Sequence, residues 1–392
     1  MLLSISLILL VGMFAGWICT RLHLPSLLGM ILTGMILGPF TLNLIDDSIL
    51  NISSELRKIA LIIILTRAGL ALNFKDLKKV GRPAILMCFV PACFEILGII
   101  ILAPKLLGIS IIDAAIMGAV IAAVSPAIIV PKMLKMMEEG YGVNKGIPQL
   151  ILAGASVDDV FVIVLFFAFT NLAQEGTISL LNFIQIPISI FLGIIIGVLI
   201  GYILIKYFSI IHIRDSIKVM IIICISFILV TIEDNFSLSI PFSSLISIMC
   251  IGIIIQRKKQ ILANRLSLKF NKLWIGAEIM LFVLVGATVD LRYVLESSVF
   301  VIILILGGVI FRALGVFCCL LKTKLELKER LFCIMAYMPK ATVQAAIGSL
   351  PLAMGLSCGK IVLTVAVLSI LITAPIGAFL IDISYKVLTD NK

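Results

Sequence analysis

The sequence predicts an all-α, polytopic membrane protein, and its composition and the length of its apolar runs are the observations that predict it. Of 392 residues, 62% are hydrophobic and only 13% are charged, and the mean hydropathy is +1.26. A helix needs about 20 apolar residues to cross the hydrocarbon core of a bilayer, and runs of that length recur along the chain. These features exclude a soluble globular protein of this size.

Apolar runs between charged or turn-forming residues predict about thirteen transmembrane helices. The first run, "MLLSISLILLVGMFAGWIC", has no basic residues before it and is long enough to span, so we expect a retained helix rather than a cleaved signal. The predicted helices cover residues 2–20, 25–42, 57–73, 83–103, 109–132, 147–171, 186–206, 215–232, 240–256, 273–290, 297–321, 331–355 and 361–383.

The cationic residues predict the orientation of the chain in the membrane. Most of the 31 Lys and Arg follow the odd-numbered helices, whereas the alternate loops hold only Arg57, Lys58, Lys105, Arg292 and Lys360. Cationic loops stay in the cytoplasm, so we expect the N-terminus outside and the C-terminus inside, in a multi-pass protein of the plasma membrane. The same rule accounts for the net charge of +10, so the chain is not expected to bind nucleic acid.

A repeat is visible in the positions of the charged and glycine residues. "FEILG" (94–98) corresponds to "FRALG" (311–315), and "GLALNFK" (69–75) corresponds to "GATVDLR" (286–292). Both pairs are 217 positions apart. Since an odd number of helices separates the two copies, the repeats are expected to have opposite orientations in the membrane.

Two segments at matching repeat positions carry prolines in the middle of a predicted span. They are "AAVSPAIIVPKML" (122–134) and "AYMPKATVQAAIGSLPL" (336–352). We expect the helix breaks at Pro126, Pro131 and Pro339, because proline removes a backbone donor. A broken helix in lipid is tolerated only beside a protein-buried or wet cavity. Inverted repeats with interrupted helices are typical of secondary transporters.

This pattern divides the chain into two six-helix units within one transport domain. The first inverted repeat covers 1–171, a linker helix covers 186–206, and the second repeat covers 215–383.

Three charged side chains in the predicted spans are interpreted as stabilising the structure rather than binding the substrate. Glu95 and Arg312 occupy equivalent positions of the two repeats, so we expect them to form a buried ion pair that joins the repeats rather than a substrate site. Lys340 directly follows Pro339. There, a cation would offset the partial negative charge of helix C-termini that meet at the break.

Asp158 and Asp159 are two adjacent carboxylates inside the apolar stretch "LILAGASVDDVFVIVLFFAF". The corresponding helix of the second repeat, "KIVLTVAVLSILITAPIGAF" (360–379), has no carboxylate. A carboxylate in a poorly solvated site near a like charge holds a proton more readily, and can exchange it for a small cation. Hard cations prefer oxygen ligands. Oxygens of Ser125, Ser156 and the opened backbone near Pro126 would complete the ligand shell. Competition between H⁺ and a cation for one of these carboxylates is antiport.

These motifs carry a family resemblance. "VSPAIIVPKML", "GASVDDVFVIVLF" and "MPKATVQAAIGSLPLA" resemble the monovalent cation/proton antiporter superfamily, most closely its NHA-type sodium/hydrogen exchanger branch, which is related to the NapA and NhaA antiporters. The resemblance covers essentially the whole chain. It implies an NhaA-like fold of thirteen helices, with two crossed discontinuous helices at 122–134 and 336–352.

The resemblance also implies how the protein works. It implies a core domain formed by helices in 57–171 and 273–383, a dimerisation domain formed by the remaining helices, elevator-type alternating access and a homodimer. Asp159 matches the family's essential ion-binding aspartate, with Asp158 as its partner, so Asp159 would hold a monovalent cation transiently. No cofactor and no enzymatic activity are expected.

One departure from many double-aspartate relatives affects the expected stoichiometry. Those relatives carry a Lys on the helix that here contains "FRALG", and it pairs with the first aspartate. Here Arg312 stands on that helix, and Arg cannot release a proton at ordinary pH. If Glu95 holds Arg312, Asp158 lacks a cationic partner, and we expect electroneutral exchange of Na⁺ or Li⁺ for H⁺.

Other functions remain open from the sequence. They are K⁺/H⁺ exchange and sodium-coupled symport of an organic solute, although few mid-helix hydrogen-bonding residues besides Gln344 would line a solute pocket. An intramembrane aspartyl protease also buries two aspartates. Its acids face each other from separate helices, whereas Asp158 and Asp159 are consecutive on one helix.

Overall fold

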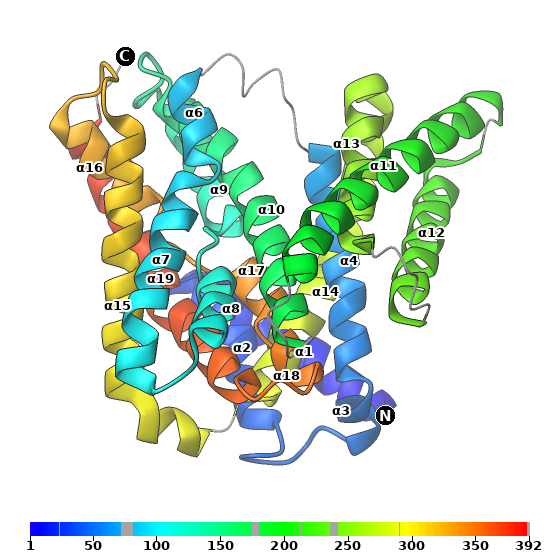
Figure 1. Ribbon diagram of the computed structural model, residues 1–392, viewed down its shortest axis with the longest axis horizontal. Coiled ribbons are helices and arrows are strands. Elements are labelled where there is room, and N and C mark those ends of the chain that lie inside the picture. The colour runs from blue at the N-terminus through cyan, green and yellow to red at the C-terminus, as the bar shows by residue number, and fades with distance from the viewer. Residues whose placement is uncertain are drawn as a thin grey trace. The chain divides into compact units, whose positions relative to one another are not determined.

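The computed structural model is all-helical in the residues it describes, which are 1–22, 24–71, 81–174, 180–211, 213–235, 242–289 and 291–389. Figure 1 shows the helices in chain order. Nine helices in these ranges are long and apolar enough to cross a membrane. Each of the thirteen predicted segments overlaps at least one helix.

The chain forms two compact units. Unit 1 comprises Met1–Ser54, Lys75–Ala173 and Ile279–Lys392, and unit 2 comprises Glu55–Phe74 and Gln174–Glu278. The helices that lie mainly in unit 2 are α4 (Ser53–Ala71), α11 (Leu180–Ile210), α12 (Asp215–Asn235), α13 (Ser244–Lys258) and α14 (Gln260–Ala287), whose last residues belong to unit 1.

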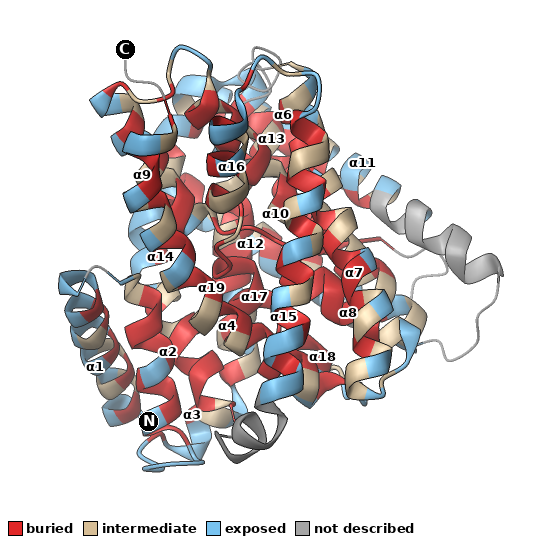
Figure 2. Cartoon of the chain, turned by 90° about the vertical axis from the view of Figure 1, so that its left-hand side faces the viewer, coloured by how far each residue is buried: buried red, intermediate tan, exposed pale blue. Residues whose placement is uncertain are grey.

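Unit 1 contains every residue proposed for the ion site, on its helices or between them. Its helices are α1 (Leu2–Arg21), α2 (Ser26–Leu37), α3 (Asp47–Asn51), α6 (Arg82–Met87), α7 (Val90–Leu107), α8 (Ile111–Ile121), α9 (Pro126–Glu139), α10 (Ile147–Gln174), α15 (Leu291–Leu320), α16 (Leu327–Ala336), α17 (Thr342–Ile347), α18 (Leu350–Ala353) and α19 (Gly359–Leu388). Figure 2 shows that burial is concentrated around α17, all six residues of which are buried.

The two repeat motifs "FEILG" and "FRALG" lie against each other on α7 and α15. A Cβ added to Gly98 would lie 2.5 Å from the ring of Phe311. Reciprocally, a Cβ added to Gly315 would lie 3.1 Å from Cβ of Phe94. Each motif therefore supplies the glycine against which the phenylalanine of the other packs, and this close approach aligns Glu95 with Arg312.

Two helices are interrupted where the sequence predicts breaks. α8 ends at Ile121 and α9 begins at Pro126, and residues 122–125 between them are not helical. Pro126 is tolerated there because the first turn of a helix does not use that N–H group. α16 ends at Ala336 and α17 begins at Thr342, with Pro339 in the gap.

The prediction of a break at Pro131 was wrong. Pro131 lies inside α9, which continues to Glu139. Proline at this position removes one backbone hydrogen bond, to the carbonyl of Ala127, near the start of the helix. The remaining turns keep their hydrogen bonds, so the helix continues.

The predicted start of a helix at residue 273 was also wrong, because α14 begins at Gln260. The residues before 273 include Arg265, Lys269 and Lys272, so they do not form an apolar run. They instead bury one face, formed by Ala263, Leu266 and Phe270. This spacing of three and four residues is that of an amphipathic helix.

Candidate functional site

The two helix breaks of unit 1 are hydrogen-bonded to each other. The N–H of Ser125 donates to the carbonyl of Pro339 at 2.8 Å. The side-chain amide of Gln344 donates to the carbonyls of Ala123 at 2.8 Å and Ile121 at 3.3 Å. Residues far apart in sequence therefore form one buried polar centre.

Arg312 on α15 is the hub of this centre. Its Nε donates to the carbonyl of Tyr337 at 2.7 Å, and its Nη1 donates to the carbonyl of Ala122. Nη1 also lies 3.1 Å from Oε2 of Glu95, and Nη2 lies 2.7 Å from Oδ2 of Asp158. One guanidinium thus satisfies backbone carbonyls at both breaks and two carboxylates from other helices.

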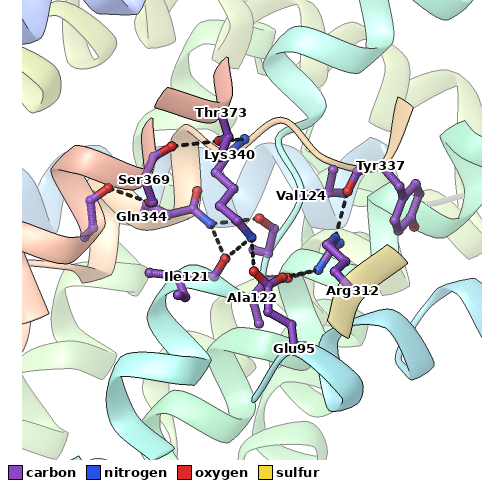
Figure 3. A network of polar contacts seen from close by, with 12 residues as sticks. Glu95, Ile121, Ala122, Val124, Arg312, Tyr337, Lys340, Gln344, Ser369 and Thr373 are labelled. Atoms are coloured by element: carbon purple, nitrogen blue, oxygen red, sulfur yellow. Dashed lines mark hydrogen bonds and ion pairs between the residues drawn. The ribbon is translucent and has the colours of Figure 1, made fainter. Parts of the chain in front are cut away.

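Lys340 brings a positive charge to the C-terminal end of α8. Its Nζ donates to the carbonyl of Ile121, the last residue of α8, and lies 2.6 Å from Oε1 of Glu95. Figure 3 shows Lys340 and Gln344 converging on Ile121, with Glu95 between Lys340 and Arg312. A cation at a helix C-terminus offsets the partial negative charge of its carbonyls.

Glu95 is therefore shared between two cations. Both Glu95 and Lys340 have no exposed surface, and Arg312 is 1% exposed. The Glu95–Arg312 contact expected from the repeat is present, and the Glu95–Lys340 contact comes in addition to it.

The expectation that Asp158 lacks a cationic partner was wrong. Asp158 is fully buried, and its Oδ2 accepts from the N–H of Val124 at 2.9 Å as well as pairing with Arg312. A planar guanidinium has five N–H donors directed along different edges. Glu95 and Asp158 occupy different nitrogens of Arg312, so one contact does not exclude the other.

Asp159 differs from its neighbour in its polar contacts. Its side chain is partly exposed, and its buried Oδ1 has no hydrogen-bond partner among the described residues. Among the described residues, Asp159 makes no ion pair within 4.0 Å. The hydroxyl of Ser125, which is 1% exposed, also lacks a partner there. Ser156 lies on α10, and its side chain is outside the described part of the structure.

The charges of the centre do not cancel. Three carboxylates, from Glu95, Asp158 and Asp159, accompany the two cations Arg312 and Lys340. Glu95 and Asp158 contact these cations directly. One negative charge remains, and a single proton or monovalent cation at Asp159 would neutralise it.

Sequence reasoning missed the part played by Tyr337. The interpretation relied on charge and proline, and Tyr337 is neither, although it stands two residues before Pro339. In the structure it is fully buried beside Arg312.

Comparison with known sequences places the chain in a family. The profile of the family "Sodium/hydrogen exchanger, transmembrane" matches residues 5–383. The chain is 34% identical over 379 residues to human "Sodium/hydrogen exchanger 9B2", covering 92% of this chain and 69% of that protein. It is 33% identical over 372 residues to the mouse protein of the same name, covering 92% of this chain and 68% of that protein.

Comparison with solved structures finds the same fold in a protein of known structure. The structure of the sodium proton antiporter MjNhaP1 from Methanocaldococcus jannaschii at pH 8 superposes with a TM-score of 0.85 and 21% sequence identity, covering 98% of this chain and 97% of that chain. The fold is thus that of an antiporter of known structure. The chain belongs to the sodium/hydrogen exchanger family, and it is a multi-pass membrane transporter of Na⁺ and H⁺ rather than an enzyme.

Proposed function

We propose that Asp159 is the group that binds Na⁺ and H⁺ in turn. The surrounding ion pairs of Arg312 and Lys340 would neutralise the other two carboxylates of the centre, so that Asp159 alone exchanges its cation. The observation that carries the proposal is the single uncompensated carboxylate beside two helix breaks, with its Oδ1 lacking a partner among the described residues. A lone carboxylate in a poorly solvated site is stabilised by whichever cation reaches it.

The hydroxyl of Ser125, the side chain of Ser156 and Oδ1 of Asp158 are proposed as further oxygen ligands for the cation. Ser125 Oγ and Asp158 Oδ1 are buried and without a partner in the described ranges. Alkali cations are hard ions, which bind to oxygen. Ser156 is included on its place in the sequence, three residues before Asp159.

We propose that the exchange is electroneutral, one Na⁺ or Li⁺ for one H⁺. The supporting reason differs from the one expected from the sequence, because Asp158 is held by Arg312. Arg does not release its proton at ordinary pH, so the Arg312–Asp158 pair keeps its charge through the cycle. Only the occupant of Asp159 changes.

The remaining expectations about architecture are also proposals. They are thirteen spans in two inverted repeats with crossed broken helices, a mobile core built from helices in 57–171 and 273–383, elevator-type alternating access and a homodimer. The contact between Glu95 and Arg312, 217 positions apart, supports the repeat. Native mass spectrometry of the purified protein would measure the oligomeric state.

The proposed orientation has the N-terminus outside and the C-terminus in the cytoplasm, in a plasma membrane. The cationic loops support it.

A pH-gradient assay tests the proposed function. The protein is reconstituted in vesicles that carry a pH-sensitive dye and are more acidic inside than outside, and Na⁺, Li⁺ or K⁺ is then added outside. We expect Na⁺ and Li⁺ to dissipate the gradient for the wild type. Asp159→Asn should abolish the response while the purified protein keeps its monodispersity, because the amide cannot exchange a proton.

Three outcomes would change the assignment. Full activity of Asp159→Asn would remove Asp159 from its role. A response to K⁺ alone would indicate K⁺/H⁺ exchange, whereas Na⁺ uptake that leaves the pH gradient unchanged would favour a sodium-coupled symporter.

A further inference from the structure

We propose that Tyr337 is a positioning residue, which holds Arg312 against Asp158 and thereby sets how tightly Na⁺ is bound at Asp159. This inference rests on the proposed role of Asp159. It concerns a residue that carries no charge and that contacts the ion site only through Arg312.

Tyr337 holds Arg312 in two ways. It is the C-cap residue of α16, and its carbonyl, which lies at the second break, accepts from Nε of Arg312 at 2.7 Å. Its ring lies under the guanidinium, with Cζ of Arg312 5.1 Å from the ring centroid. Figure 3 shows the Tyr337 side chain beside Arg312, on the side away from Lys340. A buried cation gains substantially from an aromatic face because no water competes for it.

Tyr337 also makes a hydrogen bond through its phenol group. Its hydroxyl donates to the carbonyl of Met87 at 3.1 Å. Met87 is the last residue of α6, and Pro91 stands four residues later at the start of α7. Since proline has no N–H group, the usual helical donor for the Met87 carbonyl is missing. The Tyr337 hydroxyl takes its place, which adds one hydrogen bond to a ring that packing already confines.

A glycine on α10, one turn before Asp158 and Asp159, provides the space that the Tyr337 side chain occupies. Gly154 lies four residues before Asp158, and a Cβ added there would lie 2.5 Å from Oη of Tyr337 and 2.8 Å from Cβ of Met87. Neither neighbour can move freely, because the hydroxyl is bonded to backbone. The ring is therefore held between the end of α6 and the helix that carries Asp158 and Asp159.

The arrangement predicts a coupling between the ring and the acid pair. Without the ring, Arg312 has more freedom, Asp158 is held less firmly beside Asp159, and Na⁺ is bound less tightly at Asp159. Higher pH is then needed for Na⁺ to compete. The titratable and charged groups around Arg312 and Tyr337 are Glu95, Asp158, Asp159, Lys340, Cys88 and Cys319.

The test compares Tyr337→Leu with Tyr337→Phe in reconstituted vesicles. For Tyr337→Leu we expect the half-saturating Na⁺ concentration near neutral pH to rise on the order of tenfold, the size of effect for a buried cation–π contact. The pH profile of exchange should move to more alkaline values. Tyr337→Phe keeps the ring face, so its half-saturating Na⁺ concentration and its pH profile should lie close to those of the wild type.

The matched control is Phe332→Leu. Phe332 is also fully buried on α16, in a hydrophobic cluster that includes Tyr337. It tests the loss of a core ring alone, and we expect an unchanged half-saturating Na⁺ concentration and pH profile.

Three results would overturn the inference while leaving Asp159 in its role. One is a Tyr337→Leu protein with wild-type half-saturation and pH profile. Another is a Tyr337→Phe protein that behaves like Tyr337→Leu, which would assign the effect to the hydroxyl. The third is the same alkaline shift in Phe332→Leu. Failure of the proposed function itself would show separately, as full exchange by Asp159→Asn.

Discussion

At the scale of single residues, two neighbouring aspartates occupy different environments because a helix turns about 100° per residue. Asp158 is directed to the hydrogen-bond donors at the helix breaks, where Val124 and Arg312 contact it. Asp159 has one oxygen without a partner in the described ranges. In the proposed function the adjacent acids therefore divide two tasks, with Asp158 contacting Arg312 and Asp159 binding the exchanged cation.

Glu95 is predicted to act through stability. Glu95→Ala removes the carboxylate that contacts both Arg312 and Lys340. Removing one member of a buried charge pair costs roughly 3–5 kcal/mol, because the remaining charge is left buried and uncompensated. We expect a marked fall in the melting temperature of the purified protein, measured by thermal unfolding in detergent.

Glu55→Ala provides the control for this experiment. Glu55 pairs with Lys58 at 3.5 Å, and its side chain is 67% exposed. Surface pairs contribute about 0–1 kcal/mol, so its melting temperature should stay close to that of the wild type. If Glu95→Ala melted at the same temperature as Glu55→Ala, the shared ion pair would not hold the helices together.

Some residue contacts could be predicted from the sequence and others could not. The repeat offset was enough to bring Glu95 to Arg312. Arg312 also contacts Asp158, and this could not be predicted, because a pattern of charges does not show how many edges of a guanidinium are occupied. The same limit applies to Tyr337, whose proposed role depends on the Met87 carbonyl of α6 and on Gly154 of α10.

At the scale of helices, the pair α7 and α15 depends on close approach at glycine. Gly98→Ala would place a methyl group 2.5 Å from the Phe311 ring. The two helices would have to move apart next to Glu95, and overpacking of this kind costs about 1–3 kcal/mol. We expect a lower melting temperature and slower exchange, measured on the same preparation.

Gly276→Ala is the matched substitution for comparison. Gly276 lies in α14 and nothing is within 4 Å of a Cβ added there. Alanine favours a helix over glycine, so this variant should be as stable as the wild type or more stable. Equal destabilisation by the two substitutions would argue against a special contact at Gly98.

Helix positions were predictable where hydrophobicity decided them. All thirteen predicted segments overlap helices, because apolar runs of span length are unambiguous. The start of α14 was missed because its first turns bury only one face. Pro131 was misread because a proline can remove one backbone hydrogen bond without ending the helix, whereas Pro126 and Pro339 lie where the backbone actually leaves the helix.

At the scale of the whole molecule, the account predicts that transport moves no net charge. The wild type is reconstituted in vesicles, and currents are recorded on a solid-supported membrane during a Na⁺ concentration jump. We expect a gradient-driven pH change without a sustained current, since one monovalent cation replaces one proton at Asp159. A sustained current of the sign of H⁺ movement would show that a second proton is carried.

The most direct measurement of the central claim is the release of protons when Na⁺ binds to the purified protein. NaCl is added in weakly buffered detergent solution near the pH at which exchange is half-maximal, and the liberated acid is titrated. The account predicts release of up to roughly one proton per Na⁺ bound, because both compete for one carboxylate, and no release from Asp159→Asn. Proton release from Asp159→Asn equal to that of the wild type, or Na⁺ binding to the wild type with no proton release, would contradict it.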